Sequence, residues 1–598
     1  MSPHLKLDLL RQAMRVAGVQ ACLIPSADPH LSEYLPESWQ VRRWLTGFTG
    51  SVGTVVVTAE FAGVWVDSRY WVQAELDLAG SGFELMKIGA VGDLAHTHWL
   101  AADLKPGDTL AVDGRALSWA GSQALVGLLT PRQVRIETGL DLISEVWLDR
   151  PHLSTAPVYA FDLTYAGLSR SQKLAAVRRE MQQYHAAWHV ISTLDDVAWL
   201  LNLRGQDVDF NPVFMAHVLI SDQTAQIFID LNKVGPALHA ELKQDGFEVL
   251  PYEAVQNALA HVSGHDAILF DPMRMTVALI NACPAQRVMA VNPSTLMKSR
   301  KTEHELNHVR HAMRHDGLAL CEFFAWLEKA IENRAIEPLT ELMLDTKLFQ
   351  YRSKQPGYVS RSFATIAAFN ANGAMPHYRA TQSSYASIEG DGLLLLDSGA
   401  QYLGGTTDIT RMIPVGQLSD LQRADCTAVL RGMIALSQLT FPEGVASPLI
   451  DAIARAPLWA SLTEYGHGTG HGVGYFLNVH EGPQVISYRA GVTPQTAMHV
   501  GMITSNEPGL YRPNQWGVRI ENLICCQEAG ESEFGRFLSF ETLTVCPIDS
   551  RCLDLHALRP HELAWLNQYH HWVRSKLAPD LSGAPLDWLL GKTEPVSV

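Results

Sequence analysis

Long apolar runs, basic clusters and CxxC cysteine pairs are all missing from this sequence. No stretch approaches twenty consecutive apolar residues, so no membrane-spanning helix is expected. The first residues contain no apolar segment of signal-peptide length. Lys and Arg form no block, and the formal net charge is −16. A nucleic-acid partner is therefore not expected, because such binding depends on contacts between cationic side chains and phosphates.

Cysteine is sparse, with eight residues in 598 and no pair at CxxC spacing. A disulfide framework would show more regular spacing. Most of the eight lie in apolar surroundings, so we expect buried free thiols, which are typical of a reducing compartment. Together with the missing signal peptide, this predicts a cytoplasmic protein.

The composition is that of a folded globular protein, with 47% apolar and 18% charged residues. A chain of 598 residues is too long for one hydrophobic core, so several domains are expected. The sequence contains no Walker phosphate loop and no GxSxG nucleophile elbow. Neither nucleotide hydrolysis nor serine-hydrolase chemistry is therefore indicated by a motif.

The N-terminal half shows a repeated order of helix, strand and glycine-containing turn. An amphipathic helix is expected over residues 7–17, where Leu7, Leu10, Met14 and Ala17 share one face and Gly18 is a stop signal. A strand follows at 21–25 and a turn at 45–50. Residues 170–186, 188–192 and 201–205 repeat this order. The pattern predicts an internal duplication of one α/β domain.

Boundaries are expected near residues 149–151 and 292–294. The predicted domains are 1–150 and 151–300, which are two related α/β domains, then a catalytic unit over 301–535 and an extension over 536–598. The extension is predicted to be helical over residues 560–575. Its three tryptophans, Trp565, Trp572 and Trp588, predict that it docks on an apolar surface.

Four carboxylates follow or flank strand-like segments in the predicted catalytic unit. Asp397 ends an apolar strand, where a charge is unfavourable unless it is paired or bound to metal. A returning strand that begins near Asp408 would bring the two aspartates together through a bulge or a wide loop. Glu507 and Glu521 are related in the same way about a turn at Asn514.

Between these two pairs lies a glycine-rich segment, residues 466–474, which contains His467 and His471. One imidazole and four carboxylates suit two divalent ions such as Mn²⁺ better than a structural zinc site. On the second glutamate strand, Arg519 would share a face with Glu521 and keep it ionised. From the residues alone, a metal site and ordinary surface or capping roles both stay open.

These segments closely resemble the signature of the Xaa-Pro aminopeptidases, the aminopeptidase P members of the pita-bread metallopeptidase superfamily. The resemblance covers nearly the whole chain. It is carried by residues 45–51, 67–70, 202–205, 211–214, 397–400, 407–411, 465–483, 507–511, 517–521 and 565–570. It implies two creatinase-like α/β domains, a pita-bread catalytic domain and a helical tail.

The resemblance also implies site roles. Asp397 would bind one metal ion, His471 and Glu507 the other, and Asp408 and Glu521 would bridge both. The ions would be Mn²⁺, with Zn²⁺ or Co²⁺ as alternatives, and would activate a bridging water. His480 or His467 would stabilise the oxyanion, and Glu507 would handle the proton. The substrate-side residues would be His377, His467, His480, Arg519, Tyr511 and Arg69.

The expected reaction is hydrolysis of the bond between an N-terminal residue and a proline at the second position. The expected assembly is a homodimer built through the catalytic unit and the tail. Two other functions stay open. One is a prolidase-type dipeptidase, which uses the same five ligands. The other is a non-catalytic pita-bread binding module, although such relatives typically lose ligands and none is lost here.

Overall fold

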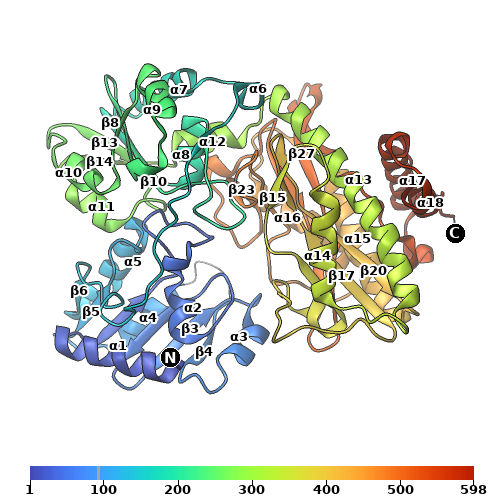
Figure 1. Cartoon of the computed structure of the whole chain (residues 1–598), viewed down its shortest axis with the longest axis horizontal. Coiled ribbons are helices and arrows are strands. Elements are labelled where there is room, and N and C mark those ends of the chain that lie inside the picture. Colours follow the sequence, from blue (N-terminus) through green and yellow to red (C-terminus); the bar gives the residue numbers. More distant parts are fainter. Residues whose placement is uncertain (90–93, 598) are drawn as a thin grey trace. The chain divides into compact units, whose positions relative to one another are not determined.

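The structure, a computed structural model, describes residues 1–89 and 94–597. The chain divides into two compact units, Met1–Thr295 and Leu296–Val598. Figure 1 draws the first unit in blue to green and the second in yellow-green to red. No helix among the described residues is long and apolar enough to cross a membrane.

The N-terminal unit begins with a six-stranded mixed sheet of order β4-β3-β2-β1-β5-β6. Its strands are β1 (Ala21–Ile24), β2 (Thr54–Thr58), β3 (Ala62–Val66), β4 (Glu84–Lys87), β5 (Thr109–Val112) and β6 (Arg135–Glu137). The helices of this part are α1 (Pro3–Ala17), α2 (Val41–Thr46), α3 (Trp71–Asp77), α4 (Ala95–Asp103) and α5 (Trp119–Leu129).

A second six-stranded sheet follows, of order β12-β11-β10-β8-β13-β14. Its strands are β8 (Trp188–Ile191), β10 (Ala216–Ser221), β11 (Ala225–Ile229), β12 (Glu248–Pro251), β13 (Ala267–Phe270) and β14 (Gln286–Met289). A short pair, β7 (Tyr159–Ala160) and β9 (Leu203–Arg204), accompanies it. The helices are α6 (Leu163–Ala166), α7 (Arg170–Gln183), α8 (Leu194–Leu201), α9 (Pro236–Gln244), α10 (Val255–Ala260) and α11 (Val277–Ala282). The next helix, α12 (Pro293–Ser299), begins in the first unit and ends in the second.

The two sheets are copies of one topology. In each, the first strand pairs antiparallel with the second and parallel with the fifth, and the outer strands on both sides pair parallel. The internal duplication predicted from the sequence is therefore confirmed.

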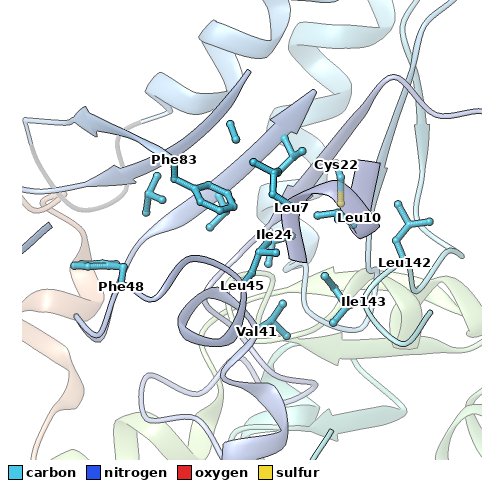
Figure 2. Close-up of a cluster of buried hydrophobic side chains, with 14 of the residues drawn as sticks. Leu7, Leu10, Cys22, Ile24, Val41, Leu45, Phe48, Phe83, Leu142 and Ile143 are labelled. Carbon is cyan, nitrogen blue, oxygen red and sulfur yellow. The ribbon is translucent and has the colours of Figure 1, made fainter. Parts of the chain in front are cut away.

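Helix α1 shows how the sequence pattern sets the core of the first sheet. Leu7, Leu10 and Met14 are buried, and Gly18 ends the helix in the left-handed conformation at φ 70°. The helix begins at Pro3 because Ser2 caps it, earlier than expected, and Ala17 is exposed rather than buried. Figure 2 shows Leu7 and Leu10 packed among Cys22, Ile24 and other apolar side chains.

The C-terminal unit is built from long helices and short antiparallel strands. Its helices are α13 (Glu303–Asn333), α14 (Glu341–Arg352), α15 (Asp420–Ser437), α16 (Ser447–Trp459), α17 (Pro560–Leu577) and α18 (Gly583–Lys592). Its strands are β15 (Tyr358–Arg361), β16 (Ile366–Phe369), β17 (Gly392–Ser398), β18 (Ala400–Tyr402), β19 (Gly405–Thr406), β20 (Ile409–Val415), β21 (Phe441–Pro442), β22 (Gly470–Gly472), β23 (Glu481–Ile486), β24 (Ile503–Asn506), β25 (Gly509–Arg512), β26 (Trp516–Arg519), β27 (Asn522–Ser532) and β28 (Gly535–Thr542).

Two apolar cores position the strands that carry the acidic residues. One packs α13 and α14 against β16, β17 and β20, and Figure 1 shows α13 and α14 beside β17 and β20. The other packs α15 and α16 against β23, β27 and β28. Asp397 and Asp408 thus lie in or directly before strands of the first core, and Glu521 lies directly before β27 of the second.

The tail is helical as predicted, but its tryptophans behave differently from one another. Trp588 of α18 packs against the α13 core, with its ring 5.4 Å from that of Phe324. Trp565 and Trp572 lie half-buried beside Tyr569 on their own helix α17. All eight cysteines are free and buried, as expected.

Candidate metal centre

Asp397 and Asp408 are brought together by the pairing of β17 with β20. Asp397 lies opposite Thr410 in this antiparallel ladder, and Asp408 stands just before β20. The connection between the strands contains β18 and β19, so it is the wide loop that the residue count predicted. Both aspartates are buried, at 7% and 5% exposure.

Glu507 and Glu521 sit where a long hairpin is interrupted. Strand β24 pairs with β27, and β25 pairs with β26. Both ladders are centred on Asn514, which adopts a positive φ of 62° in the turn, as the sequence predicted. Between the two ladders the chain passes through Glu507 and Pro508 on one side and Glu521 on the other. Pro508 has no N–H to donate, so the hydrogen-bonded ladder is interrupted at this point, and Glu507 and Glu521 both lie in the interruption.

His471 lies in β22, which pairs with β23 on one side and β24 on the other. A Cβ on Gly470 would lie 1.9 Å from the carbonyl oxygen of Ser505, and one on Gly472 would lie 2.2 Å from that of Glu481. Only glycine fits at both positions. The histidine between them therefore projects from a strand whose backbone approaches both partners closely.

The tautomer of His471 favours a cation in front of its ring. Its Nδ1 lies 2.9 Å from the carbonyl oxygen of Gly472, so this nitrogen carries a proton and donates it. Its Nε2 lies 3.2 Å from Glu507 Oε1 and 3.6 Å from Asp408 Oδ2. A lone pair facing two carboxylate oxygens is repulsive unless a proton or a metal ion stands between them. A backbone carbonyl behind the ring is also the usual support of a metal-binding histidine.

Three more carboxyl groups complete the cluster. Ligand atoms of Asp397, Asp408 and Glu521 all lie within 4.8 Å of one another. Asp397 Oδ1 and Glu521 Oε1 are buried without a hydrogen-bond partner. Buried carboxylate oxygens are normally satisfied, so two unsatisfied ones beside a third acid fit a site for divalent cations. The oxygen-rich donor set with one imidazole suits ions such as Mn²⁺, Zn²⁺ or Co²⁺.

The pKa values of these groups report the same crowding. Burial raises the pKa of Asp408 well above its ordinary value, and the charges of Glu521, Asp397 and Glu507 add to the effect. Burial and the charges of Glu507 and Asp397 likewise raise the pKa of Glu521. The pKa of Asp397 is raised by burial despite the nearby Arg519. Cations in the cluster would offset this repulsion.

Glu507 behaves differently from the other acids. Burial raises the pKa of Glu507, but its contact with His471 and the nearby guanidinium of Arg519 lower it to about 2. Ser505 Oγ also donates to Glu507 Oε1 over 2.9 Å. Glu507 is therefore ionised at neutral pH.

Arg519 pairs with Asp397 rather than with Glu521, which corrects the expectation from strand periodicity. Its Nη2 lies 2.5 Å from Asp397 Oδ2, and its Nε approaches Glu507 Oε2 at 4.0 Å. The reason is that the ladder breaks between Arg519 and Glu521, so the two-residue period does not carry across. Glu521 instead accepts a hydrogen bond from Thr410 Oγ1 at 2.8 Å.

Arg519 also begins a chain of hydrogen bonds. Its Nη1 donates to Tyr511 Oη at 2.7 Å, and Tyr511 Oη lies 2.7 Å from His467 Nε2. His467 Nδ1 donates to the carbonyl oxygen of Gly468, so Nε2 accepts from Tyr511. Burial lowers the pKa of His467 to about 4. His467 is therefore neutral, and its Nε2 has no proton to donate to a substrate.

The remaining site residues predicted from the sequence lie as follows. The ring centroid of His480 is 4.2 Å from that of His471, in an edge-to-face arrangement. His377 is half-buried in the loop that follows β16. Arg69 belongs to the N-terminal unit, where its guanidinium pairs with both oxygens of Asp67 at 2.7 and 2.9 Å and lies over the ring of Tyr70.

Sequence reasoning missed two hydroxyls that hold the acidic residues, Thr410 and Ser505. Thr410 stands two positions after Asp408, and Ser505 stands two positions before Glu507. Alternate residues of a strand share a face, so the period of two would have found both. Ser505 Oγ additionally accepts from the backbone N–H of His471 at 2.9 Å.

Sequence reasoning also missed the support of the glycine-rich segment by α16. Arg455 donates to the carbonyl oxygens of Tyr465 and His467 at 3.0 and 2.6 Å and pairs with Asp451 at 2.8 Å. Asp451 in turn accepts from Thr469 Oγ1. Asp451 and Arg455 are four residues apart on one helix, a spacing that the sequence shows, whereas their contacts with residues 465–469 depend on how the loop folds back onto α16.

A further motif match proves to be structural. Residues 304–308 read His-Glu-Leu-Asn-His, the HExxH spacing of zinc peptidases. Its Glu305 is buried and accepts from the backbone N–H and hydroxyl of Thr302, which caps α13. Among the described residues, the one cluster of three or more metal-ligating groups is the Asp397 cluster.

Comparisons with known proteins agree with this geometry. Metallopeptidase family M24 matches residues 307–528, and the C-terminal region of peptidase_M24 matches 536–596. The Creatinase/Prolidase N-terminal domain matches twice, at residues 6–140 and 149–305.

The chain is 37% identical to Aminopeptidase P2 of Arabidopsis thaliana over 97% of this chain and 86% of that protein. It is 35% identical to Xaa-Pro aminopeptidase 1 of Dictyostelium discoideum over 99% and 96%. An X-prolyl aminopeptidase structure from Caenorhabditis elegans, described as a cytosolic enzyme with a di-nuclear active site, is 31% identical, with a TM-score of 0.94 and full coverage of both chains. The chain therefore belongs to metallopeptidase family M24, in its Xaa-Pro aminopeptidase branch.

Proposed function

We propose that this protein removes the first residue from peptides that carry proline at the second position, with two divalent ions held by the five-residue cluster. It is a metal-dependent Xaa-Pro aminopeptidase by its relatives. The observation that carries the ion site is the set of buried carboxyl groups within 4.8 Å, two of them with unsatisfied oxygens, facing the Nε2 atom of His471.

Each ligand has a proposed place. Asp397 would hold one ion, and His471 and Glu507, whose ligand atoms are 3.2 Å apart, would hold the other. Asp408 and Glu521 would contact both. We propose Mn²⁺, with Zn²⁺ or Co²⁺ as alternatives, since four of the five ligands are carboxylates. When bound, such ions supply an activated water at neutral pH and polarise the scissile carbonyl.

The chain's own residues divide the proton and charge chemistry. Glu507 is ionised at neutral pH, so its carboxylate could accept a proton from water. His480 is the proposed donor to the developing oxyanion. His467 suits that role less, because its Nε2 already accepts from Tyr511. His467, His377, Tyr511 and Arg519 would line the substrate side.

Proline at the second position has a physical basis in the amide itself. The bond before proline is a tertiary amide with no N–H and with φ fixed near −65°. A pocket that fits this ring and offers no acceptor for an N–H would select it. Arg69 of the N-terminal unit is a proposed substrate contact. Unchanged kcat/KM for tripeptides in Arg69→Ala would remove that role, because the pairing with Asp67 would then be its whole function.

One assay separates the three candidate functions. Metal-loaded protein is given Xaa-Pro-Yaa tripeptides and Xaa-Pro dipeptides in parallel, and the release of the first residue is measured. Cleavage of tripeptides supports the aminopeptidase. Cleavage of dipeptides alone would show a prolidase. Stoichiometric metal binding with no cleavage of either peptide would show a binding module.

A homodimer and a cytoplasmic location are further proposals. Apolar side chains are exposed on and after α16: Leu449 at 60%, Trp459 at 41% and Leu462 at 96%. Exposed apolar groups gathered on one element favour a protein interface. The tail's Trp588 is already packed within its own unit, so the catalytic unit is the better candidate for the contact. A monomer by light scattering at micromolar concentration would contradict the dimer.

The cytoplasmic location is supported by eight free, buried cysteines and by the cytosolic description of the Caenorhabditis elegans enzyme. Imaging or fractionation of the tagged protein in its host would test it. Recovery in a secreted or membrane fraction would contradict it.

A further inference from the structure

Three charged side chains are buried together beside the metal cluster. Lys301 Nζ contacts Glu481 Oε1, and Lys298 Nζ lies 3.5 Å from Glu481 Oε2. The side chains of Lys298, Lys301 and Glu481 are 2%, 0% and 1% exposed. Burying charges is costly unless they are well paired. The two ammonium groups and the carboxylate therefore depend on one another, and removing either charge would leave the other buried without its partner.

Glu481 is directly joined to the candidate catalytic histidine. It is the first residue of β23 and follows His480 in the chain. In the β22–β23 ladder it lies opposite Gly472, the neighbour of His471. Its carbonyl approaches Gly472 too closely for any side chain there. Whatever fixes Glu481 thus also fixes the backbone that carries His480 toward His471.

Lys301 is itself held firmly. Its backbone N–H donates to the carbonyl oxygen of Gly501 at 3.0 Å, and the preceding Arg300 forms an antiparallel bridge with Met502. A Cβ on Gly501 would lie 2.3 Å from the carbonyl oxygen of Lys301. Residues 501–502 lead into β24, the strand that ends just before Glu507. Lys301 therefore joins the strand before Glu507 to the strand after His480.

We propose that Lys301, assisted by Lys298, is a positioning residue for His480, which it holds in its catalytic orientation through Glu481. The ammonium group of Lys301 donates to Glu481 and to the carbonyl oxygen of Ser299, neither of which is a proposed metal ligand, so its loss should act on turnover and not on metal binding. The inference rests on the proposed role of His480 as the oxyanion donor. It assigns a positioning role to the end of α12 and to the residues that lead from it to α13.

The test is a double-mutant cycle of Lys301→Met and His480→Ala, measured as kcat on a Xaa-Pro-Yaa tripeptide, with metal content by elemental analysis. Lys301→Met should lower kcat by about 10- to 100-fold, because small misplacements of a catalytic group have costs of this size. KM and the two equivalents of metal should stay unchanged. In the His480→Ala background, Lys301→Met should have little further effect, since its target is already gone.

Two further variants guard against loss of folding. Glu481→Gln keeps the shape of the carboxylate and removes its charge, and Lys298→Met removes the more distant ammonium. Both should lower kcat without loss of metal, with Lys298→Met the milder. The matched control is Lys233→Met, which breaks a buried pair of the same kind, with Asp207, in the N-terminal unit and should lower thermal stability without this kcat effect.

The three kinds of failure are distinguishable. Full activity in His480→Ala would overturn the proposed role of His480. A large loss in His480→Ala, together with an undiminished effect of Lys301→Met in that background, would overturn the positioning role alone. Loss of metal in a folded Lys301→Met protein, or in folded Glu481→Gln, would also overturn it.

Discussion

Replacement of Asp408 by asparagine should stabilise the metal-free protein while destroying the metal site. Ligand atoms of Asp408, Asp397 and Glu521 lie within 4.8 Å. Two unit charges at that distance repel by about 3.5 kcal/mol at an effective dielectric constant near 20. The buried cluster relieves this by binding protons, which is why burial and its acidic neighbours raise the pKa of Asp408.

Protonation of Asp408 sets an upper limit on the stability that Asp408→Asn can gain. Keeping a carboxyl with an unfolded pKa near 3.9 protonated at pH 7.5 costs at most about 5 kcal/mol of folding free energy. The Asp408→Asn variant would avoid this cost, so we expect a gain of about 3 kcal/mol at pH 7.5, or about 5 °C in Tm for a unit of this size. Because the folded pKa is raised, the unfavourable contribution of Asp408 to stability declines as pH falls, and the advantage of Asp408→Asn shrinks toward zero near pH 4.

The assay is calorimetry of chelator-treated protein at pH 7.5 and pH 5, before and after addition of Mn²⁺. Mn²⁺ should raise the Tm of the native protein and leave that of Asp408→Asn unchanged. The control is Asp316→Asn, because Asp316 is equally buried but pairs with Arg352 at 2.8 and 2.9 Å. That variant should be destabilised. A similar loss of Tm in metal-free Asp408→Asn at pH 7.5 would refute the crowding argument.

Three other outcomes are expected. His480→Ala should retain two equivalents of metal but lose about 10²–10³ in kcat, by analogy with the loss of an oxyanion donor; loss of metal would place His480 among the ligands. Tyr511→Phe should lower kcat/KM by about tenfold, because it breaks the hydrogen-bond link between Arg519 and His467. The pH profile should not change, because burial raises the pKa of Tyr511 to about 12; a shifted profile would contradict this. Burial lowers the pKa of His189 to about 4, so this residue should cost the N-terminal unit about 2 kcal/mol of unfolding free energy as pH falls from 7.5 to 5. Hydrogen exchange of β8 should show that loss in the native protein but not in His189→Gln.

Much of the fold could be predicted because it follows from local chemistry. The apolar spacing of Leu7, Leu10 and Met14 produces a helix, and Gly18 ends it. The symmetry of Glu507 and Glu521 about Asn514 predicted the hairpin, because antiparallel pairing conserves the sum of paired residue numbers. The repeated order of helix, strand and turn predicted two sheets of the same topology.

The sequence by itself also determined the candidate metal set, since four acids and His471 belong to recognisable segments that resemble one family. The tertiary structure alone decided how these residues are supported. Arg519 pairs with Asp397 because a ladder breaks between Arg519 and Glu521. The contact of Lys301 with Glu481 joins positions 180 residues apart, and that of Arg411 with the carbonyl oxygen of Glu521 joins positions 110 residues apart. Such contacts depend on where whole elements pack, and side-chain spacing along one element carries no information about them.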